Sequence, residues 1–349
     1  MSTKGSANGN GGALMSPKKK QMGDGTVVNA IVAALRNRLA EKVDEVDPVP
    51  PEVRIDGKTC FITGANSGLG RAAAVDLAKR GASVILACRP GHEGLQQELE
   101  QQSGTTKVEL MNVDLADLES VHKLCNELRD RQQNIDIAVF NAGLMTRTAV
   151  KTPQGYDTMF VVHFLSSRII VDRWLRDGIL QTGSGTPRLI FVSSEAHRSS
   201  HAIDFDRLGA FVPFTLKESL RHYGVSKLIL CTYATELSRR LNGTDVQVAV
   251  HSLCPGGVAT NIARDAPRWM RPMVDPVMKL FFPSPEAAIG PITYLCCSED
   301  AGTSTGMYLH MMQQKLVSEF ARDRANGEKL WEASEELVQH LDGNHLNDI

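Results

Sequence analysis

The stretch Thr63-Gly64-Ala65-Asn66-Ser67-Gly68-Leu69-Gly70 separates a short apolar run from a segment with helical periodicity. The run at 59–63 predicts a first β-strand, and residues 71–79 predict a helix that Gly81 closes. Glycines between a strand and a helix let the backbone approach a pyrophosphate, and the free N–H groups of the helix N-terminus favour its charge. The stretch therefore predicts a dinucleotide site, although glycines also serve ordinary turns.

Short apolar runs alternate with helical stretches from residue 55 to about residue 309. The runs at 59–63, 83–88, 108–113, 135–140, 189–192 and 246–253 predict strands, and the stretches at 73–79, 95–101, 121–128, 159–175 and 228–241 predict helices. Strands that alternate with helices form a parallel sheet covered on both faces. The sequence therefore predicts the α/β class, a doubly wound parallel sheet of the Rossmann type in a single domain.

The two ends of the chain differ in character from this central part. Residues 1–25 are polar and contain Lys18-Lys19-Lys20, which indicates a disordered leader. Apolar residues at three- and four-residue intervals over 27–46 predict an amphipathic helix, docked on the domain or lying on a membrane surface, and Pro48-Val49-Pro50-Pro51 ends it. We expect a leader at 1–25, a helix and linker at 26–54, a dinucleotide-binding and catalytic domain at 55–313 and a C-terminal helical extension at 314–349.

Composition excludes several classes of protein. Among 349 residues, 38 Lys and Arg against 40 Asp and Glu leave a net charge of −2, which gives no general attraction to nucleic acid. The seven cysteines are scattered and form no metal-ligand spacing, which predicts reduced thiols in an intracellular, cytoplasmic protein without a metal. No apolar stretch reaches the ~20 residues of a transmembrane helix. Contact with a membrane surface or an organelle stays open.

The second predicted strand ends at Leu86-Ala87-Cys88-Arg89. NAD-dependent enzymes commonly place an acid here to bind the ribose hydroxyls, whereas a guanidinium pairs with a 2′-phosphate and stacks on adenine. Arg89 therefore predicts NADP(H) as the cofactor, with Arg71 as a second contact. The alternative is that Arg89 is a solvated loop charge.

Tyr223-Gly224-Val225-Ser226-Lys227 begins an apolar-periodic segment, and the spacing of four places Tyr223 and Lys227 on one helical face. An ammonium near a phenol stabilises phenolate and lowers the tyrosine pKa, which makes the side chain a usable acid or base. Upstream, the buried strand at 189–192 leads into Ser193 and Ser194, at the end of the sheet where α/β proteins bind ligands.

With these motifs the chain resembles the short-chain dehydrogenase/reductase superfamily over residues 55–313. Ser-Ser-x-Ala-His at 193–197 and Leu330-Trp331-Glu332-Ala333-Ser334 resemble its branch of retinol dehydrogenases and WW-domain oxidoreductases. The resemblance implies that Tyr223 is the acid/base, that Lys227 binds the nicotinamide ribose and lowers the tyrosine pKa, and that Ser194, rather than Ser193, positions the substrate oxygen.

The resemblance also extends the expected cofactor site beyond the glycine turn. It implies that Asp114-Leu115 contacts adenine, that Asn141-Ala142-Gly143 ends the fourth strand, and that the motif at 255–260 lines the nicotinamide. The expected cofactor-binding residues are Gly64, Asn66, Ser67, Gly68, Leu69, Gly70, Arg89, Asp114, Leu115, Asn141, Ala142, Gly143, Tyr223, Lys227, Pro255, Gly256, Val258 and Thr260.

One position departs from the family pattern. The family carries a catalytic Asn on the helix before the serine strand, but here the run is Phe160-Val161-Val162-His163-Phe164. An imidazole can donate and accept hydrogen bonds, so His163 is a candidate relay toward Lys227, and the alternative is a packed histidine. As a relay, it predicts that activity falls as the pH drops through the histidine pKa, ~6.5 when unperturbed.

Residues 269–282 are rich in Met and aromatic side chains, which adapt to an irregular apolar ligand. An ordinary packed helix or a contact between copies of the chain is the alternative, so a homo-oligomer stays open. We expect an NADP(H)-dependent oxidoreductase that interconverts a lipophilic carbonyl and its alcohol. The rival class is an NADP(H)-binding redox sensor or scaffold with little turnover.

Overall fold

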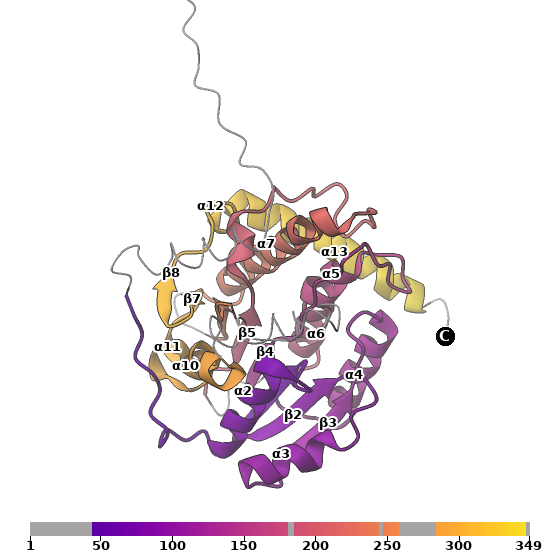
Figure 1. Ribbon diagram of the computed structural model, residues 1–349. Coiled ribbons are helices and arrows are strands. Elements are labelled where there is room, and N and C mark those ends of the chain that lie inside the picture. The colour runs from indigo at the N-terminus through magenta and orange to yellow at the C-terminus, as the bar shows by residue number, and fades with distance from the viewer. Residues whose placement is uncertain (1–43, 181–184, 244–246, 258–283, 347–349) are drawn as a thin grey trace, which may run out of the picture. The chain divides into compact units, whose positions relative to one another are not determined.

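The computed structural model describes residues 44–180, 185–243, 247–257 and 284–346 (Figure 1). Nearly all of the predicted amphipathic helix at 27–46, and all of the Met-rich segment at 269–282, lie outside these residues. In the described part of the chain one sheet has the strand order β3-β2-β1-β4-β5-β6-β7-β8. The strands are β1 (Thr59–Thr63), β2 (Ser83–Cys88), β3 (Val108–Asn112), β4 (Ile137–Phe140), β5 (Arg188–Val192), β6 (Ala249–Cys254), β7 (Tyr308–His310) and β8 (Gln313–Lys315).

Neighbouring strands from β3 to β7 run parallel, which confirms the predicted doubly wound sheet. The exception is β8, which pairs antiparallel with β7 although residues 314 and 315 were expected to begin a helical extension. A two-residue turn joins the two strands, and its first residue, Met311, has φ +56°. Turns of this kind usually carry Gly or Asn there, so no residue at this position predicts a hairpin.

The helices are α2 (Gly68–Lys79), α3 (Leu95–Ser103), α4 (Leu118–Asp130), α5 (Thr158–Phe160), the π-helix η1 (Val161–Leu165), α6 (Ser166–Arg176), the 3-10 helix η3 (Glu195–Arg198), α7 (Leu216–Arg240), α9 (Pro285–Ala288), α10 (Gly290–Cys297), α11 (Glu299–Thr303), α12 (Glu319–Arg322) and α13 (Arg324–Leu346). Alternate residues of each strand face opposite sides. Phe61 packs into a core with α4, α6 and α7, and Ile62 packs into a second core with α2, α3 and α10. Helix α13 lies along α7 (Figure 1).

Strand β1 lies between β2 and β4, so the chain winds away from it in both directions. Open α/β sheets bind ligands at such a switch point, outside the carboxyl ends of the strands. All seven cysteines are free, as their scattered positions predicted, and all are buried. Within the described ranges, no helix combines the length and the apolar character that crossing a bilayer demands.

Candidate active site

The glycine turn joins β1 to α2 at the carboxyl edge of the sheet. Gly64 and Gly68 have φ values of +67° and +54°, which a side chain would strain. A Cβ at Gly70 would lie 2.5 Å from the Gly64 carbonyl oxygen and would collide with the Asn141 amide. The turn therefore needs glycine at each of these positions, as the sequence indicated.

Asn141, at the end of β4, holds this turn from behind. Its side-chain Nδ2 donates to the Thr63 carbonyl oxygen at 2.9 Å. The Thr63 hydroxyl in turn accepts from the backbone N–H groups of Asn141 and Ala142, both at 3.0 Å. The structure thus brings the ends of the first and fourth strands together as expected. Thr63, which the sequence did not single out, links them by hydrogen bonds.

The start of α2 offers free donors to an anion. Ser67 is the N-cap residue, its side chain makes no capping hydrogen bond, and the first turn contains no acidic residue. The backbone N–H groups of an uncapped helix start attract a phosphate, because they lack partners and carry the positive end of the helix dipole. These residues fit the pyrophosphate of a dinucleotide.

The loop after β2 places Arg89 on the surface, exposed. Arg71, expected to add a second contact, instead pairs with Glu98 at 2.7 Å. His92, which the sequence analysis missed, lies against the glycine turn, with its Nε2 at 3.1 Å from the Asn66 Nδ2. Asp114 accepts from the Ala116 backbone N–H at 3.0 Å, next to the buried Leu115.

Tyr223 and Lys227 lie on α7, which begins twelve residues before the stretch predicted from its apolar period. The helix begins at Leu216 with a capping box formed by Thr215 and Glu218. The Lys227 ammonium lies 5.8 Å from the centroid of the Tyr223 ring, so one helical face brings the two side chains together as predicted. It also donates to the carbonyl oxygen of Val192, at the end of β5, at 2.9 Å.

Burial controls both pKa values. It raises the pKa of the Tyr223 phenol to about 12, although a hydrogen bond with Ser194 lowers it. It lowers the pKa of the Lys227 ammonium to about 8. The expected lowering of the tyrosine pKa is therefore not found in the protein alone, because removing a phenolate from water outweighs what the neighbouring groups contribute.

Two serines follow β5, and their hydroxyl groups have different partners. Ser193 is buried, and its hydroxyl lies 3.3 Å from the Lys227 carbonyl oxygen and 3.0 Å from the Cys231 sulfur. Ser194 is half-buried, caps η3 through the Ala196 N–H at 3.3 Å, and hydrogen-bonds with Tyr223. The geometry therefore places Ser194, rather than Ser193, next to the phenol.

His163 lies inside the π-helix η1, an irregularity often found at functional sites. The backbone N–H of Leu144 donates to Nε2 at 3.0 Å. Nε2 is therefore unprotonated, and Nδ1 donates to the Ser226 hydroxyl at 2.8 Å. That hydroxyl donates to the Tyr223 carbonyl oxygen at 2.8 Å. The imidazole thus joins the loop after β4 to α7, through Ser226, a partner that the sequence analysis missed.

This arrangement changes the expected pH behaviour of His163. Burial, followed by repulsion from Lys227, lowers its pKa well below the ordinary value. A loss of activity near pH ~6.5, the ordinary histidine pKa, is therefore no longer expected from this residue. Both ring nitrogens also have protein partners, which favours a structural clamp over a proton relay.

Gly143 and the loop after β6 complete the edge of the site. A Cβ on Gly143 would lie 3.4 Å from the His163 Nε2 and 3.5 Å from the Lys227 Nζ, so this glycine leaves space between the loop and these two side chains. Gly256, after Pro255, has φ +81° and packs on Met311. Val258 and Thr260, expected to line the nicotinamide, lie outside the described residues.

Known proteins are similar to this chain in sequence and in fold. Residues 58–203 match the short chain dehydrogenase family. The chain is 32% identical to human retinol dehydrogenase 13 over 300 residues, which cover 83% of this chain and 87% of that protein. It is also 32% identical to the chicken WW domain-containing oxidoreductase, over 82% of this chain and 69% of that one. A solved structure of an uncharacterized protein from Mycobacterium paratuberculosis superposes with a TM-score of 0.64 at 25% identity, covering 84% of this chain and 98% of that chain.

Proposed function

The chain belongs to the short-chain dehydrogenase/reductase family, with relatives in the branch of retinol dehydrogenases and WW-domain oxidoreductases. From this we propose that it is an NADP(H)-dependent oxidoreductase that interconverts a lipophilic carbonyl and its alcohol. The observation that carries the proposal is the meeting of Tyr223, Lys227 and Ser194 beside an uncapped, glycine-bounded helix start.

The chain supplies binding and orientation, and the nicotinamide cofactor, when bound, gives or takes the hydride. The glycine turn and the first N–H groups of α2 would hold the pyrophosphate. Val192 is the acceptor recorded for the Lys227 ammonium in the described part of the chain, so two of the three N–H donors are left for the ribose hydroxyls. Arg89 would pair with a 2′-phosphate, and this preference distinguishes NADP(H) from NAD(H).

Tyr223 handles the proton at its phenol oxygen. With its pKa raised to about 12, the phenol is protonated at neutral pH, which suits the reduction of a carbonyl, where a proton must be given to the new alkoxide. Ser194 would hold the same substrate oxygen within reach by its hydroxyl. The protonated phenol of the cofactor-free protein therefore favours carbonyl reduction over alcohol oxidation.

Exposed apolar side chains near the phenol support a lipophilic substrate. Leu216 and Leu220 precede Tyr223 by seven and three residues, share its helical face, and are 63% and 49% exposed. Met145, 45% exposed, follows the Leu144 that contacts His163. The Ser219 hydroxyl donates to the Thr146 carbonyl oxygen at 2.5 Å and so joins the two segments. Retinol, in the name of the relatives, is an alcohol of this chemical kind.

A steady-state assay with aldehydes and ketones of increasing chain length tests the proposal. We expect turnover with NADPH, a kcat/KM at least about tenfold lower with NADH, and loss of that preference in Arg89→Ala, since a charge-assisted phosphate contact contributes ~1.5–3 kcal/mol. Arg176→Ala, on α6, is the control. An NADH preference in the parent would contradict the cofactor assignment. Tight NADPH binding without turnover of any substrate would favour the sensor.

A further inference from the structure

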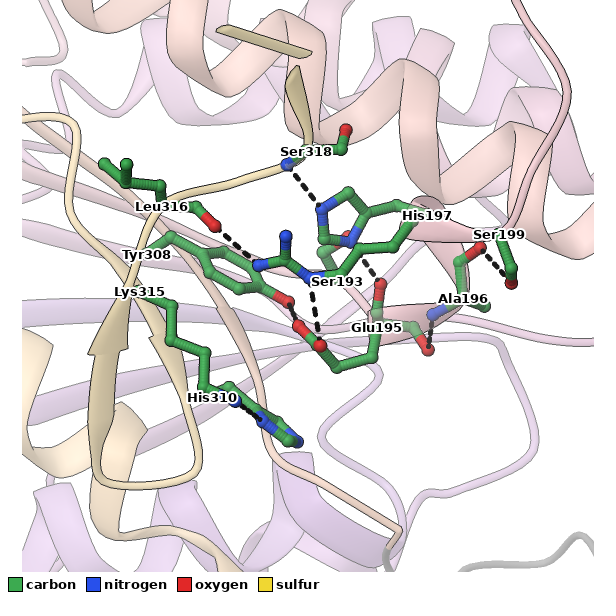
Figure 2. Close-up of polar contacts among 12 residues, drawn as sticks. Ser193, Glu195, Ala196, His197, Ser199, Tyr308, His310, Lys315, Leu316 and Ser318 are labelled. Carbon is green, nitrogen blue, oxygen red and sulfur yellow. Dashed lines mark hydrogen bonds and ion pairs between the residues drawn. The ribbon is translucent and has the colours of Figure 1, made fainter. Parts of the chain in front are cut away.

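The turn η3 follows Ser194 directly, and residues of 308–318 hold it (Figure 2). His197 is 1% exposed, and its Nδ1 donates to the Ser194 carbonyl oxygen at 2.7 Å. The backbone N–H of Ser318 donates to Nε2 of the same ring at 3.1 Å. These two bonds fix the neutral tautomer, with the proton on Nδ1, and link the Ser194 backbone to the N-cap residue of α12.

Glu195 makes a second connection between the same two segments. Its carboxylate accepts from the Tyr308 hydroxyl at 2.6 Å and from the Arg198 Nε at 3.0 Å. Arg198 also donates through Nη2 to the Leu316 carbonyl oxygen at 2.5 Å (Figure 2). The hydrogen bond from Tyr308 and the charge of Arg198 keep the pKa of the Glu195 carboxyl below its ordinary value against the opposing effect of burial. The carboxylate therefore stays charged at neutral pH.

The turn η3 also touches the catalytic helix beside Tyr223. A Cβ on Gly224 would lie 3.0 Å from the Ala196 carbonyl oxygen and 3.3 Å from the Ser200 Cβ. Because η3 and α7 are packed this closely, a shift of η3 changes the distance between the Ser194 hydroxyl and the Tyr223 phenol. Misplacement of reacting groups by about 1 Å costs as much as ~100-fold in rate.

We propose that His197 is a positioning residue, whose hydrogen bond to the Ser194 carbonyl holds the Ser194 hydroxyl beside the Tyr223 phenol, while Glu195 and Arg198 connect the same 3-10 helix to the segment 308–318. This inference rests on the proposed function, because it concerns the geometry of the Ser194 and Tyr223 pair during turnover. It gives a role to His197, the histidine of the Ser-Ser-x-Ala-His motif at 193–197.

Two substitutions at His197 separate its two hydrogen bonds. In His197→Asn the amide nitrogen stands about where Nδ1 stands and still donates to the Ser194 carbonyl, but the Ser318 N–H loses its acceptor. In His197→Gln the amide oxygen reaches about where Nε2 stands and accepts from Ser318, but the Ser194 carbonyl loses its side-chain donor and keeps only the backbone N–H of residue 197, which donates to it at 3.1 Å. Each variant loses one buried hydrogen bond, so their losses of stability should be similar.

The control is His251, another buried histidine that joins two backbone segments. It is 1% exposed, its Nε2 donates to the Ala301 carbonyl oxygen at 2.8 Å, and its Nδ1 accepts from the Met307 N–H at 3.3 Å. It lies on β6, and its partners Ala301 and Met307 belong to other segments than Ser194 and Tyr223. His251→Asn therefore measures what the loss of one such bond does to the fold alone.

The experiment measures kcat, the KM for NADPH and the thermal midpoint for the parent and the three variants. We expect a kcat about 10- to 100-fold lower in His197→Gln, a kcat within about threefold of the parent in His197→Asn and His251→Asn, and an unchanged KM for NADPH in all of them. Equal kcat values in the two His197 variants, with an active parent, would overturn the inference. A parent without turnover would instead refute the proposed function, and then a wild-type-like pH titration of the Tyr223 phenol in His197→Gln would overturn the inference independently.

Discussion

Replacing His163 by Leu decides whether this side chain relays protons or joins two segments. The variant keeps the volume of the side chain but leaves the Leu144 N–H without its acceptor, while the Ser226 hydroxyl keeps the Tyr223 carbonyl as a partner. One orphaned buried donor costs about 1–3 kcal/mol. For a domain of this size that loss lowers the thermal midpoint by about 2–6 °C.

The catalytic effect follows from where the loop after β4 lies. Leu144 follows Gly143, whose missing side chain leaves room beside Lys227, so a loosened loop should weaken cofactor binding at the ribose. We expect the KM for NADPH to rise several-fold and kcat to change less. A relay would produce the opposite division, with kcat lowered and KM unchanged.

The assay is a pH–rate profile from pH 5 to 8, with thermal midpoints measured on the same samples. Because burial and Lys227 keep the His163 pKa well below its ordinary value, parent and His163→Leu should share the same acid limb. If the parent lost activity near pH ~6.5 and His163→Leu did not, His163 would act as a proton relay, and the hypothesis that it only joins two segments would be refuted. His251→Leu controls for the loss of any buried imidazole.

Two further predictions concern the fold and the glycine turn. Gly70→Ala should raise the Kd for NADPH at least tenfold, because the new Cβ would collide with Asn141 and with the Gly64 carbonyl. Gly94→Ala is the control, since its Cβ would meet nothing within 4 Å and should leave the Kd unchanged. Equal Kd values in the two variants would contradict the close packing at Gly70. Burial lowers the pKa of His251 to about 4. Below pH ~6.5 the unfolded chain therefore binds more protons at this residue than the folded chain does. The free energy of unfolding should fall by about 3 kcal/mol between that pH and pH 4 because of this residue alone. Denaturant unfolding of His251→Gln should show a flatter acid dependence, and an unchanged slope would contradict this.

The sequence predicted the fold where local signals agreed with the tertiary structure. Strands β1 and β2 have the predicted bounds, because both are continuous apolar runs that glycines or prolines delimit. Residues 216–222 of α7 were missed although Thr215 and Glu218 carry a capping-box signal, because most of these residues are polar and the apolar segment was recognised only from Tyr223 onward. The hairpin at Met311 carries no sequence signal at all.

The motifs of the candidate site could be predicted from the sequence, but the residues that hold those motifs in place could not. Tyr223, Lys227 and Ser194 could be found because spacing along one helix and the end of one strand place them together. One partner of His163, Ser226, lies 63 residues away, and one partner of His197, Ser318, lies 121 residues away, so only the folded chain brings them into contact. The shifts in pKa follow from burial, which sequence patterns do not measure for a single side chain.

The central claim, that Tyr223 supplies the proton for carbonyl reduction, is tested most directly by Tyr223→Phe. The measurement is the rate of NADPH oxidation with a saturating lipophilic aldehyde, together with the Kd for NADPH from fluorescence titration, and Tyr294→Phe serves as the control for loss of a tyrosine hydroxyl. Positioned acid/base groups typically contribute ~10²–10⁴-fold in rate, so we expect a loss of that size in Tyr223→Phe, with a Kd within about twofold of the parent. A rate near that of the parent in Tyr223→Phe would contradict the account.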